Sequence, residues 1–162
     1  MKAEGRKRVW RPESGQNLLE LGLLLPMFLL LLMGIFDLGR YMYIYILVTN
    51  AARAGAAYGA QTLGQSVDTT GIQAAAQNDY QKSGGVSDLT VNSSVSCGCD
   101  VAGAAPTSVA CTGPGAGTCA SGHWVVTLTV TASGAYSALF PYPGIPASIN
   151  VSKTASLRVA PI

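Results

Sequence analysis

An uninterrupted apolar run near the N-terminus constrains the fold of this chain more than any other sequence feature. Leu21 to Phe36 contains no polar side chain, and the apolar character resumes from Tyr41 to Val48 after a short polar interruption. A helix needs about 20 residues to cross a hydrocarbon core of roughly 30 Å. The run therefore predicts a membrane-spanning segment over about residues 18–45, inside one long helix over residues 16–62.

Charged residues are distributed unevenly around this run. Residues 1–15 hold five basic and two acidic side chains, whereas the rest of the chain holds five basic and six acidic ones. Because basic residues concentrate on the cytoplasmic side of a span, we expect a cytoplasmic basic leader over 1–15 and an extracytoplasmic domain over 63–162. Outside the leader no basic patch with interleaved aromatic residues remains, so membrane lipid is an expected partner and nucleic acid is not.

The expected outer end of the span is marked by a charge pair. Asp37 and Arg40 are three residues apart, close enough to pair across one helical turn at the membrane interface. The tyrosines that follow are typical of an interfacial aromatic belt. A secretory signal peptide fits poorly, because its apolar region is only about 7 to 15 residues long. A plain signal anchor stays open at this point.

Two residues inside the apolar segment are unusual for a plain anchor. Glu20 stands at its inner end, where a carboxylate without a partner is costly to bury. Pro26 removes one helical hydrogen bond and conflicts with the carbonyl of Gly22, which predicts a flexible turn. The simpler alternatives are that Glu20 reaches the inner interface and that Pro26 makes a tolerated kink.

A glycine and a glutamate five residues apart mark the junction of leader and helix. Gly15 is followed by Gln16-Asn17-Leu18-Leu19-Glu20, and the sequence continues as LGLLLPMFLLLLMGIFDLGRYMYIYILVTNAARAGAAYGA. This arrangement resembles the processing site of type IV prepilins, and the longer stretch is similar to TadE-like proteins, the minor pseudopilins of tight-adherence (Flp) pili. The likeness is close over 14–60 and looser over 124–159. Leu21 stands where major Flp pilins typically carry tyrosine, which favours a minor component.

The resemblance implies partners and residue roles. Prepilin peptidase would cut between Gly15 and Gln16 on the cytoplasmic side and leave an ammonium group on Gln16. Paired with Glu20, within a subunit or between neighbours, this ammonium would remove two isolated charges from a low-dielectric bundle. Other pilin and minor pilin subunits and the inner-membrane pilus assembly machinery are the further implied partners. The implied location is the bacterial inner membrane, with incorporation into a surface pilus.

The rest of the sequence predicts an α+β fold. The outer part of the long helix is amphipathic, with an apolar face of Ile44, Leu47, Val48, Ala51, Gly55 and Tyr58. Its small residues Ala51, Gly55 and Gly59 would allow another element to approach closely. We expect this pilin-like helix to pack against a small antiparallel sheet of about three to four strands.

The elements of that domain follow from periodicity and turn residues. A loop is predicted over 63–70 and a second helix over 71–82, capped by Thr69 or Thr70. Strands are predicted over 89–96, 124–132 and 147–159. The expected inward side chains of the last two are Trp124, Val126, Leu128, Val130 and Ala132, then Ile149, Val151, Ala155, Leu157 and Val159, with Lys153 breaking the pattern. The sequence FPYPGIP over 140–146 predicts an irregular connection.

Four cysteines lie in the expected exported segment, where disulfides persist: Cys97, Cys99, Cys111 and Cys119. A bridge between Cys97 and Cys99 would close a strained ring, so each should pair with Cys111 or Cys119, in an order that the spacing leaves open. The alternative is a zinc site completed by His123. Its spacing lacks the paired C-x2-4-C knuckles of structural zinc sites.

No constellation of catalytic residues is visible. The chain has one histidine, and the acids Asp68, Asp79, Asp88 and Asp100 stand among turn and loop formers, where capping is the usual role. We therefore expect no enzymatic activity and no cofactor. The leading function is that of a structural minor pseudopilin serving adhesion or secretion. The alternative is a membrane-anchored extracytoplasmic binding or adhesive module that does not polymerise.

Overall fold

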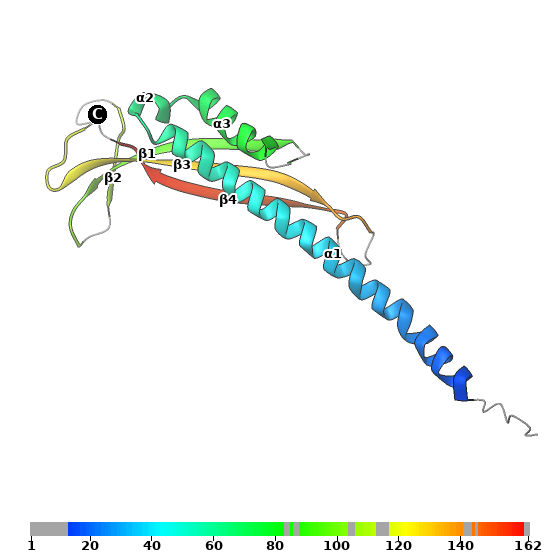
Figure 1. The fold of residues 1–162 in the computed structure, drawn as a ribbon. Coiled ribbons are helices and arrows are strands. Elements are labelled where there is room, and N and C mark those ends of the chain that lie inside the picture. Colours follow the sequence, from blue (N-terminus) through cyan, green and yellow to red (C-terminus); the bar gives the residue numbers. More distant parts are fainter. Residues whose placement is uncertain are drawn as a thin grey trace, which may run out of the picture. The chain divides into compact units, whose positions relative to one another are not determined.

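The chain divides into two compact units, Met1–Gly39 and Arg40–Ile162. The structure is a computed structural model that describes residues 13–82, 85, 88–103, 106–112, 117–140, 144 and 146–160. Its elements are α1 Glu13–Gly59, α2 Leu63–Ser66, α3 Thr69–Lys82, β1 Leu89–Asp100, β2 Thr107–Val109, β3 His123–Ser137 and β4 Ser148–Arg158 (Figure 1). The predicted leader over 1–15 lies largely outside the described residues.

The described part of the first unit is the segment of α1 over 13–39. Its large apolar side chains are exposed on every side of the helix, from Leu18 to Leu38. A helix that is apolar all round has no aqueous face and suits a lipid environment. The predicted apolar helix is confirmed, and Asn17–Gly59 contains one stretch long and apolar enough to cross a membrane.

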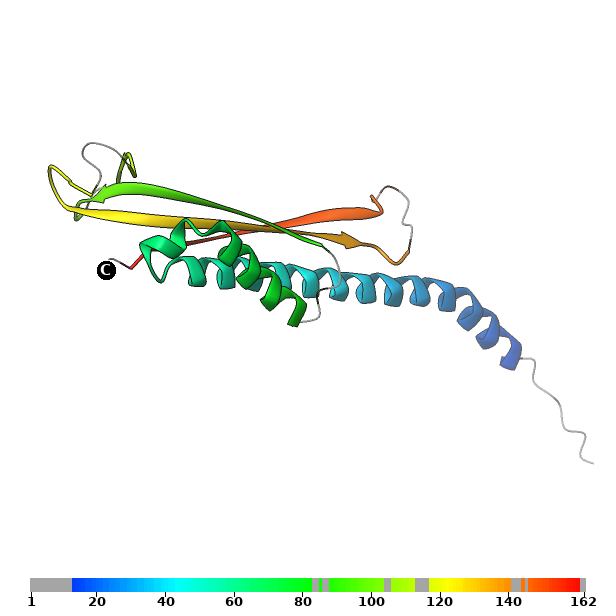
Figure 2. The same ribbon diagram turned by 90° about the horizontal axis from the view of Figure 1, so that it is seen from above.

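The second unit is built on a four-stranded antiparallel sheet in the order β2-β1-β3-β4. The later part of α1 and helix α3 lie on one face of this sheet (Figure 2). Along β3 the predicted inward residues Val126, Leu128, Val130 and Ala132 are buried. The α+β fold is therefore confirmed, and α1 packs on the chain's own sheet.

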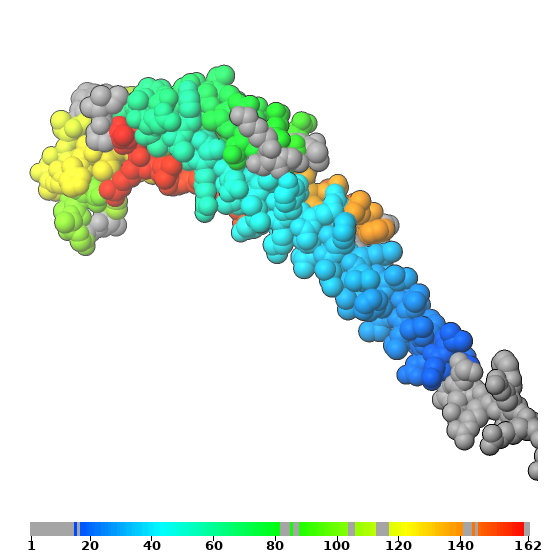
Figure 3. Space-filling model, viewed as in Figure 1, coloured from blue at the N-terminus to red at the C-terminus, as the bar shows by residue number. Residues whose placement is uncertain are grey.

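Small residues bring α1 close to its neighbours within this unit. A Cβ placed on Gly55 would lie 3.2 Å from the carbonyl oxygen of Ile72 and 3.3 Å from Cγ1 of Val130. A Cβ on Gly59 would collide with Cδ2 of Leu128. The predicted close approach at these positions is confirmed, and the second-unit part of α1 lies against α3 in the space-filling view (Figure 3).

The connection between α1 and α3 differs from the prediction. Residues 63–66 form the short helix α2 instead of a loop, because the Thr62 hydroxyl accepts a hydrogen bond from the amide of Gln65 at 3.1 Å. Helix α3 is capped by neither Thr69 nor Thr70. The carboxylate of Asp68 accepts from the amide of Gly71 at 3.0 Å and takes the capping role.

The strands also depart from the prediction in detail. Strand β1 extends to Asp100, and the three-residue strand β2 was not predicted. On β4 the predicted inward residues Ile149 and Leu157 are opposite the buried Tyr136 and Leu128, which confirms their side of the sheet, but they are 37% and 42% exposed. Strand β4 is the edge of the sheet, so its inward face is covered only in part. Most of the predicted connection over 140–146 lies outside the described residues.

Hydroxyl pairs fix the register of β3 and β4 on the open face of the sheet. Thr129 bonds Ser156 at 3.0 Å, Thr131 bonds Thr154 at 3.0 Å, and Ser133 donates to Ser152 at 2.9 Å. Cross-strand hydroxyl pairs of this kind each stabilise a sheet by a few tenths to about 1 kcal/mol. The long hairpin is thus held along its solvent face as well as by its core.

Candidate functional site

The residues predicted for processing and docking all lie at the start of α1. Gly15 is in open surroundings, with nothing within 4 Å of a Cβ placed on it, and the side chain of Glu20 is exposed. Gln16 belongs to the same helix, although its side chain lies outside the described residues. Residues four apart on a helix are neighbours on one face. The backbone therefore brings position 16 and Glu20 to the same side of α1.

The other residues predicted to act in the membrane segment also lie in α1. Pro26 lies inside α1, and a Cβ on Gly22 would meet nothing within 4 Å. Flexibility at this turn stays a prediction. Asp37 is buried and Arg40 is half-buried. An ion pair between these two residues also stays a prediction.

The four cysteines form two disulfides. Cys97 bonds Cys111, with Cα atoms 5.2 Å apart, and Cys99 bonds Cys119, with Cα atoms 5.8 Å apart. Both bridges start on the last residues of β1, one to the segment after β2 and one to the segment before β3. The disulfide prediction is confirmed and its open pairing order is now assigned. Since all four sulfurs are paired with each other, the zinc alternative is wrong.

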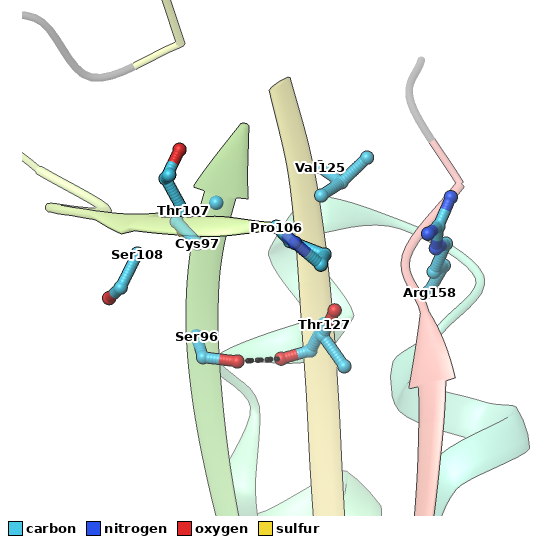
Figure 4. A pocket seen from close by; sticks show the side chains of 9 residues that line it. Ser96, Cys97, Pro106, Thr107, Ser108, Val125, Thr127 and Arg158 are labelled. Atoms are coloured by element: carbon cyan, nitrogen blue, oxygen red, sulfur yellow. Dashed lines mark hydrogen bonds between the residues drawn. The ribbon is translucent and has the colours of Figure 1, made fainter. Parts of the chain in front are cut away.

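A shallow hollow of about 170 Å³ lies on the open face of the sheet beside this stapled end (Figure 4). The Ser96 hydroxyl donates to the Thr127 carbonyl at 3.4 Å within it. Arg158 at its rim is paired with Asp100 at 2.7 Å. Both partners are partly solvated, so the ion pair contributes at most about 1 kcal/mol. The described residues that line the hollow include no nucleophile paired with a base.

A larger apolar groove of about 580 Å³ opens at the same end of the sheet. Its lining includes Leu63, Trp124, Val126 and Val159, with His123 and Arg158 at its polar side. The indole Nε1 of Trp124 is buried and finds no hydrogen-bond partner among the described residues. The sequence did not predict this groove. Alternation assigns Trp124 to the inward face, but it does not show which neighbouring side chains leave space around the indole.

Two hydrogen bonds hold the carboxylate of Asp68 in the second unit. The amide of Gly71 donates to one carboxylate oxygen and the Tyr58 hydroxyl donates to the other, each at 3.0 Å. These hydrogen bonds stabilise the ionised form and hold the pKa of Asp68 below its ordinary value. The carboxylate joins α3 to α1, and its role is structural capping.

The fold and these residues define a class of protein. Within the described residues it is an α+β protein with one candidate membrane-spanning helix towards the N-terminus and a small disulfide-bridged domain after it, as expected of a membrane-anchored single-pass protein.

Residues 15–57 match the model of the TadE-like protein family. The match begins at Gly15 and ends within the helix-packing part of α1, so it confirms the resemblance drawn from this stretch of sequence. Comparison with curated proteins and with solved structures finds no match.

Proposed function

We propose that the chain is a minor pseudopilin of a tight-adherence pilus. It is inserted in the bacterial inner membrane with its N-terminus in the cytoplasm, and prepilin peptidase cleaves it between Gly15 and Gln16. The observation that carries this proposal is the extent of the family match, which starts at the scissile glycine and includes Glu20 and the whole apolar segment. The proposed role is structural and non-enzymatic.

Glu20 is the docking residue in this proposal. Cleavage would free the α-amino group of Gln16, which lies on the same face of α1 as the exposed carboxylate of Glu20. The large apolar side chains around them, from Leu18 to Leu38, are exposed, so these two charges have few competing partners in a packed bundle. An ammonium and a carboxylate that leave water together avoid the cost of burying either one alone.

Processing is tested first, by intact-mass measurement of the protein purified from piliated cells. A mature chain that begins at Gln16 is expected, and Gly15→Ala should leave the leader attached. Gly22→Ala is the matched control, since it alters a glycine of the same helix that is equally open, and it should be processed normally. A mature chain that still begins at Met1 would contradict the proposal.

Docking is tested by Glu20→Gln, which keeps the size of the side chain and deletes its charge. An uncompensated buried ammonium costs about 3 to 5 kcal/mol, so cleaved protein should accumulate in the membrane while pili become fewer. Insertion and cleavage should be unchanged, because the apolar segment and Gly15 are intact. Normal piliation by a cleaved and normally abundant variant would remove the docking role.

The second candidate is an anchored binding module that does not polymerise. The apolar groove beside the two disulfides favours it, since a recessed apolar surface near a rigid end of a domain suits ligand capture. The two functions make opposite forecasts for Glu20→Gln. A simple anchor should be indifferent to the change or slightly stabilised by it.

A further inference from the structure

The Arg40–Ile162 unit has a concentration of exposed apolar side chains at one end. Three of its exposed large apolar side chains, Leu63, Val67 and Leu157, lie elsewhere. The exposed apolar side chains that gather at one end come from the first turns of α1 in this unit, from the residues that follow β3, and from the start of β4. We call this group the helix-entry surface; its members are Met42, Tyr43, Ile46, Leu139, Phe140 and Ile149.

Contacts within the unit bring these segments to the same end. The rings of Tyr41 and Tyr136 pack edge to face with centroids 5.5 Å apart, which joins the start of this α1 segment to the end of β3. Tyr136 is directly opposite Ile149 on β4. The ladder continues past the strands, since the amide of Ala138 donates to the carbonyl of Ala147 at 3.0 Å. The hairpin therefore reaches beyond Tyr136, where Leu139 and Phe140 are exposed.

Two cations lie against aromatic rings beside this surface. The ammonium of Lys153 is 3.8 Å from the ring centroid of Tyr45, and the guanidinium of Arg40 is 5.8 Å from that of Tyr136. Among the described acidic side chains of the unit, Asp68 and Asp79 belong to the α3 region and Asp100 to the far end of β1. Asp88 precedes Leu89, which is opposite Gly134, and is the one described carboxylate of the unit at this end of the sheet. Exposed aliphatic groups, tyrosine rings and cations together are the composition that favours a lipid headgroup layer.

We propose that the helix-entry surface lies in the lipid headgroup layer and gives the exported domain a second, peripheral contact with the membrane. This inference rests on the membrane insertion in the proposed function. Met42 and Tyr43 are two and three residues past Arg40, only about 3 to 5 Å along the helix, which is within a headgroup layer roughly 5 to 8 Å thick. The start of this surface is therefore covalently held at headgroup depth, and the apolar hairpin end at the same level of α1 is held there too.

The test uses tryptophan probes at the two ends of β4 in the full-length chain. Ile149→Trp places an indole in the helix-entry surface. Leu157→Trp is the matched control, because it lies on the same strand, faces the same side and is exposed to a similar degree. The two positions are eight residues apart, about 26 Å along the strand. Both are made with Trp10→Phe, so that Trp124 is a constant background.

Each variant is reconstituted in phosphatidylcholine–phosphatidylglycerol vesicles, with and without bromine on the acyl chains near the headgroup. The indole from Ile149→Trp should lose most of its emission to bromine, and the indole from Leu157→Trp should keep its emission. Phe140→Trp, which exchanges one aromatic ring for another, is a second probe and should behave like Ile149→Trp. Leu31→Trp reports on insertion of the apolar segment and should be strongly quenched.

Each outcome decides between the proposals. Equal quenching at 149 and 157, or no quenching at 149 and 140 while Leu31→Trp is quenched, overturns the headgroup contact and leaves membrane insertion intact. An indole at 149 that bromine does not quench, but whose emission shifts with protein concentration, assigns the surface to a second copy of the chain and also overturns it. Absence of quenching in Leu31→Trp contradicts insertion itself and therefore both proposals.

Discussion

The two parts of α1, over 13–39 and over 40–59, have the same backbone conformation and opposite side-chain environments. In the first part Leu30 is 65% exposed, whereas in the second Leu47 is 4% exposed. The first part is rich in leucine, methionine and phenylalanine all round the helix. The second alternates large residues with alanine and glycine on one face, and this face packs on α3 and the sheet. The comparison teaches that small residues, more than apolar ones, mark where a helix meets protein.

Truncating a leucine should separate the two parts most clearly. Leu47→Ala removes a buried side chain and should lower the free energy of unfolding by about 2 to 5 kcal/mol, because a cavity remains. Leu30→Ala deletes the same atoms from an exposed position and should leave unfolding of the second unit unchanged. Denaturant unfolding of the full chain in detergent, followed by Trp124 fluorescence, measures both. Equal losses of unfolding free energy in the two variants would contradict the difference between the two parts of α1.

The disulfides should stabilise the second unit alone. The double change Cys99→Ser and Cys119→Ser opens a bridge across 20 residues and should cost about 3 kcal/mol of unfolding free energy. Cys97→Ser with Cys111→Ser, across 14 residues, should cost slightly less. The same fluorescence assay gives both values, while circular dichroism should show that the helical signal persists at low denaturant. Loss of that signal would mean that the two parts unfold together.

Two glycines test the same difference between the two parts of α1, with smaller expected effects on the free energy of unfolding. Gly59→Ala inserts a methyl group against Cδ2 of Leu128 and 3.0 Å from Cδ1 of Ile72, and should destabilise the second unit by about 1 to 3 kcal/mol. Gly34→Ala meets nothing within 4 Å and should be neutral or helix-stabilising. Thermal unfolding of the two variants side by side checks this. A neutral Gly59→Ala would show that α1 can move away from the sheet.

Asp68 should give the smallest effect, and it belongs only to the second part. Its lowered pKa means that the ionised carboxylate stabilises the folded unit fully above its ordinary pKa of 3.8. This contribution should decline as the pH falls below that value and disappear below the lowered folded-state pKa. Asp68→Asn should flatten the decline. Unfolding midpoints measured from about pH 6 into the acid range, where carboxylates titrate, test it; parallel curves for both proteins would contradict it.

Several features were predictable because local sequence encodes them directly. The apolar run from Leu21 to Phe36 predicted the exposed helix, and alternation from Trp124 to Ala132 predicted the buried face of β3. The cysteines predicted two bridges. The stretch that begins with Gly15 and Glu20 carried a resemblance to TadE-like proteins, and the model of that family matches residues 15–57.

Other features depended on neighbours that are distant in sequence. The short strand β2 exists because Thr107–Val109 pairs with Cys97–Cys99, and three residues are too few to show the alternation that predicts a strand. The cap of α3 fell to Asp68, which Tyr58 from another helix also binds. Ile149 and Leu157 lie on the inward face that alternation predicts, but they belong to an edge strand, so alternation alone did not show that they stay exposed.

The sequence by itself determined the apolar helix, the α+β class and the candidate processing and docking residues, because hydrophobicity, periodicity and motif spacing are properties of short segments. Only the tertiary structure decided which cysteines pair, which glycines of α1 touch the sheet, and which apolar side chains of the second unit stay uncovered. Those outcomes depend on the three-dimensional packing of α1, α3 and the four strands. Burial is a property of this assembled packing, and no single segment carries it.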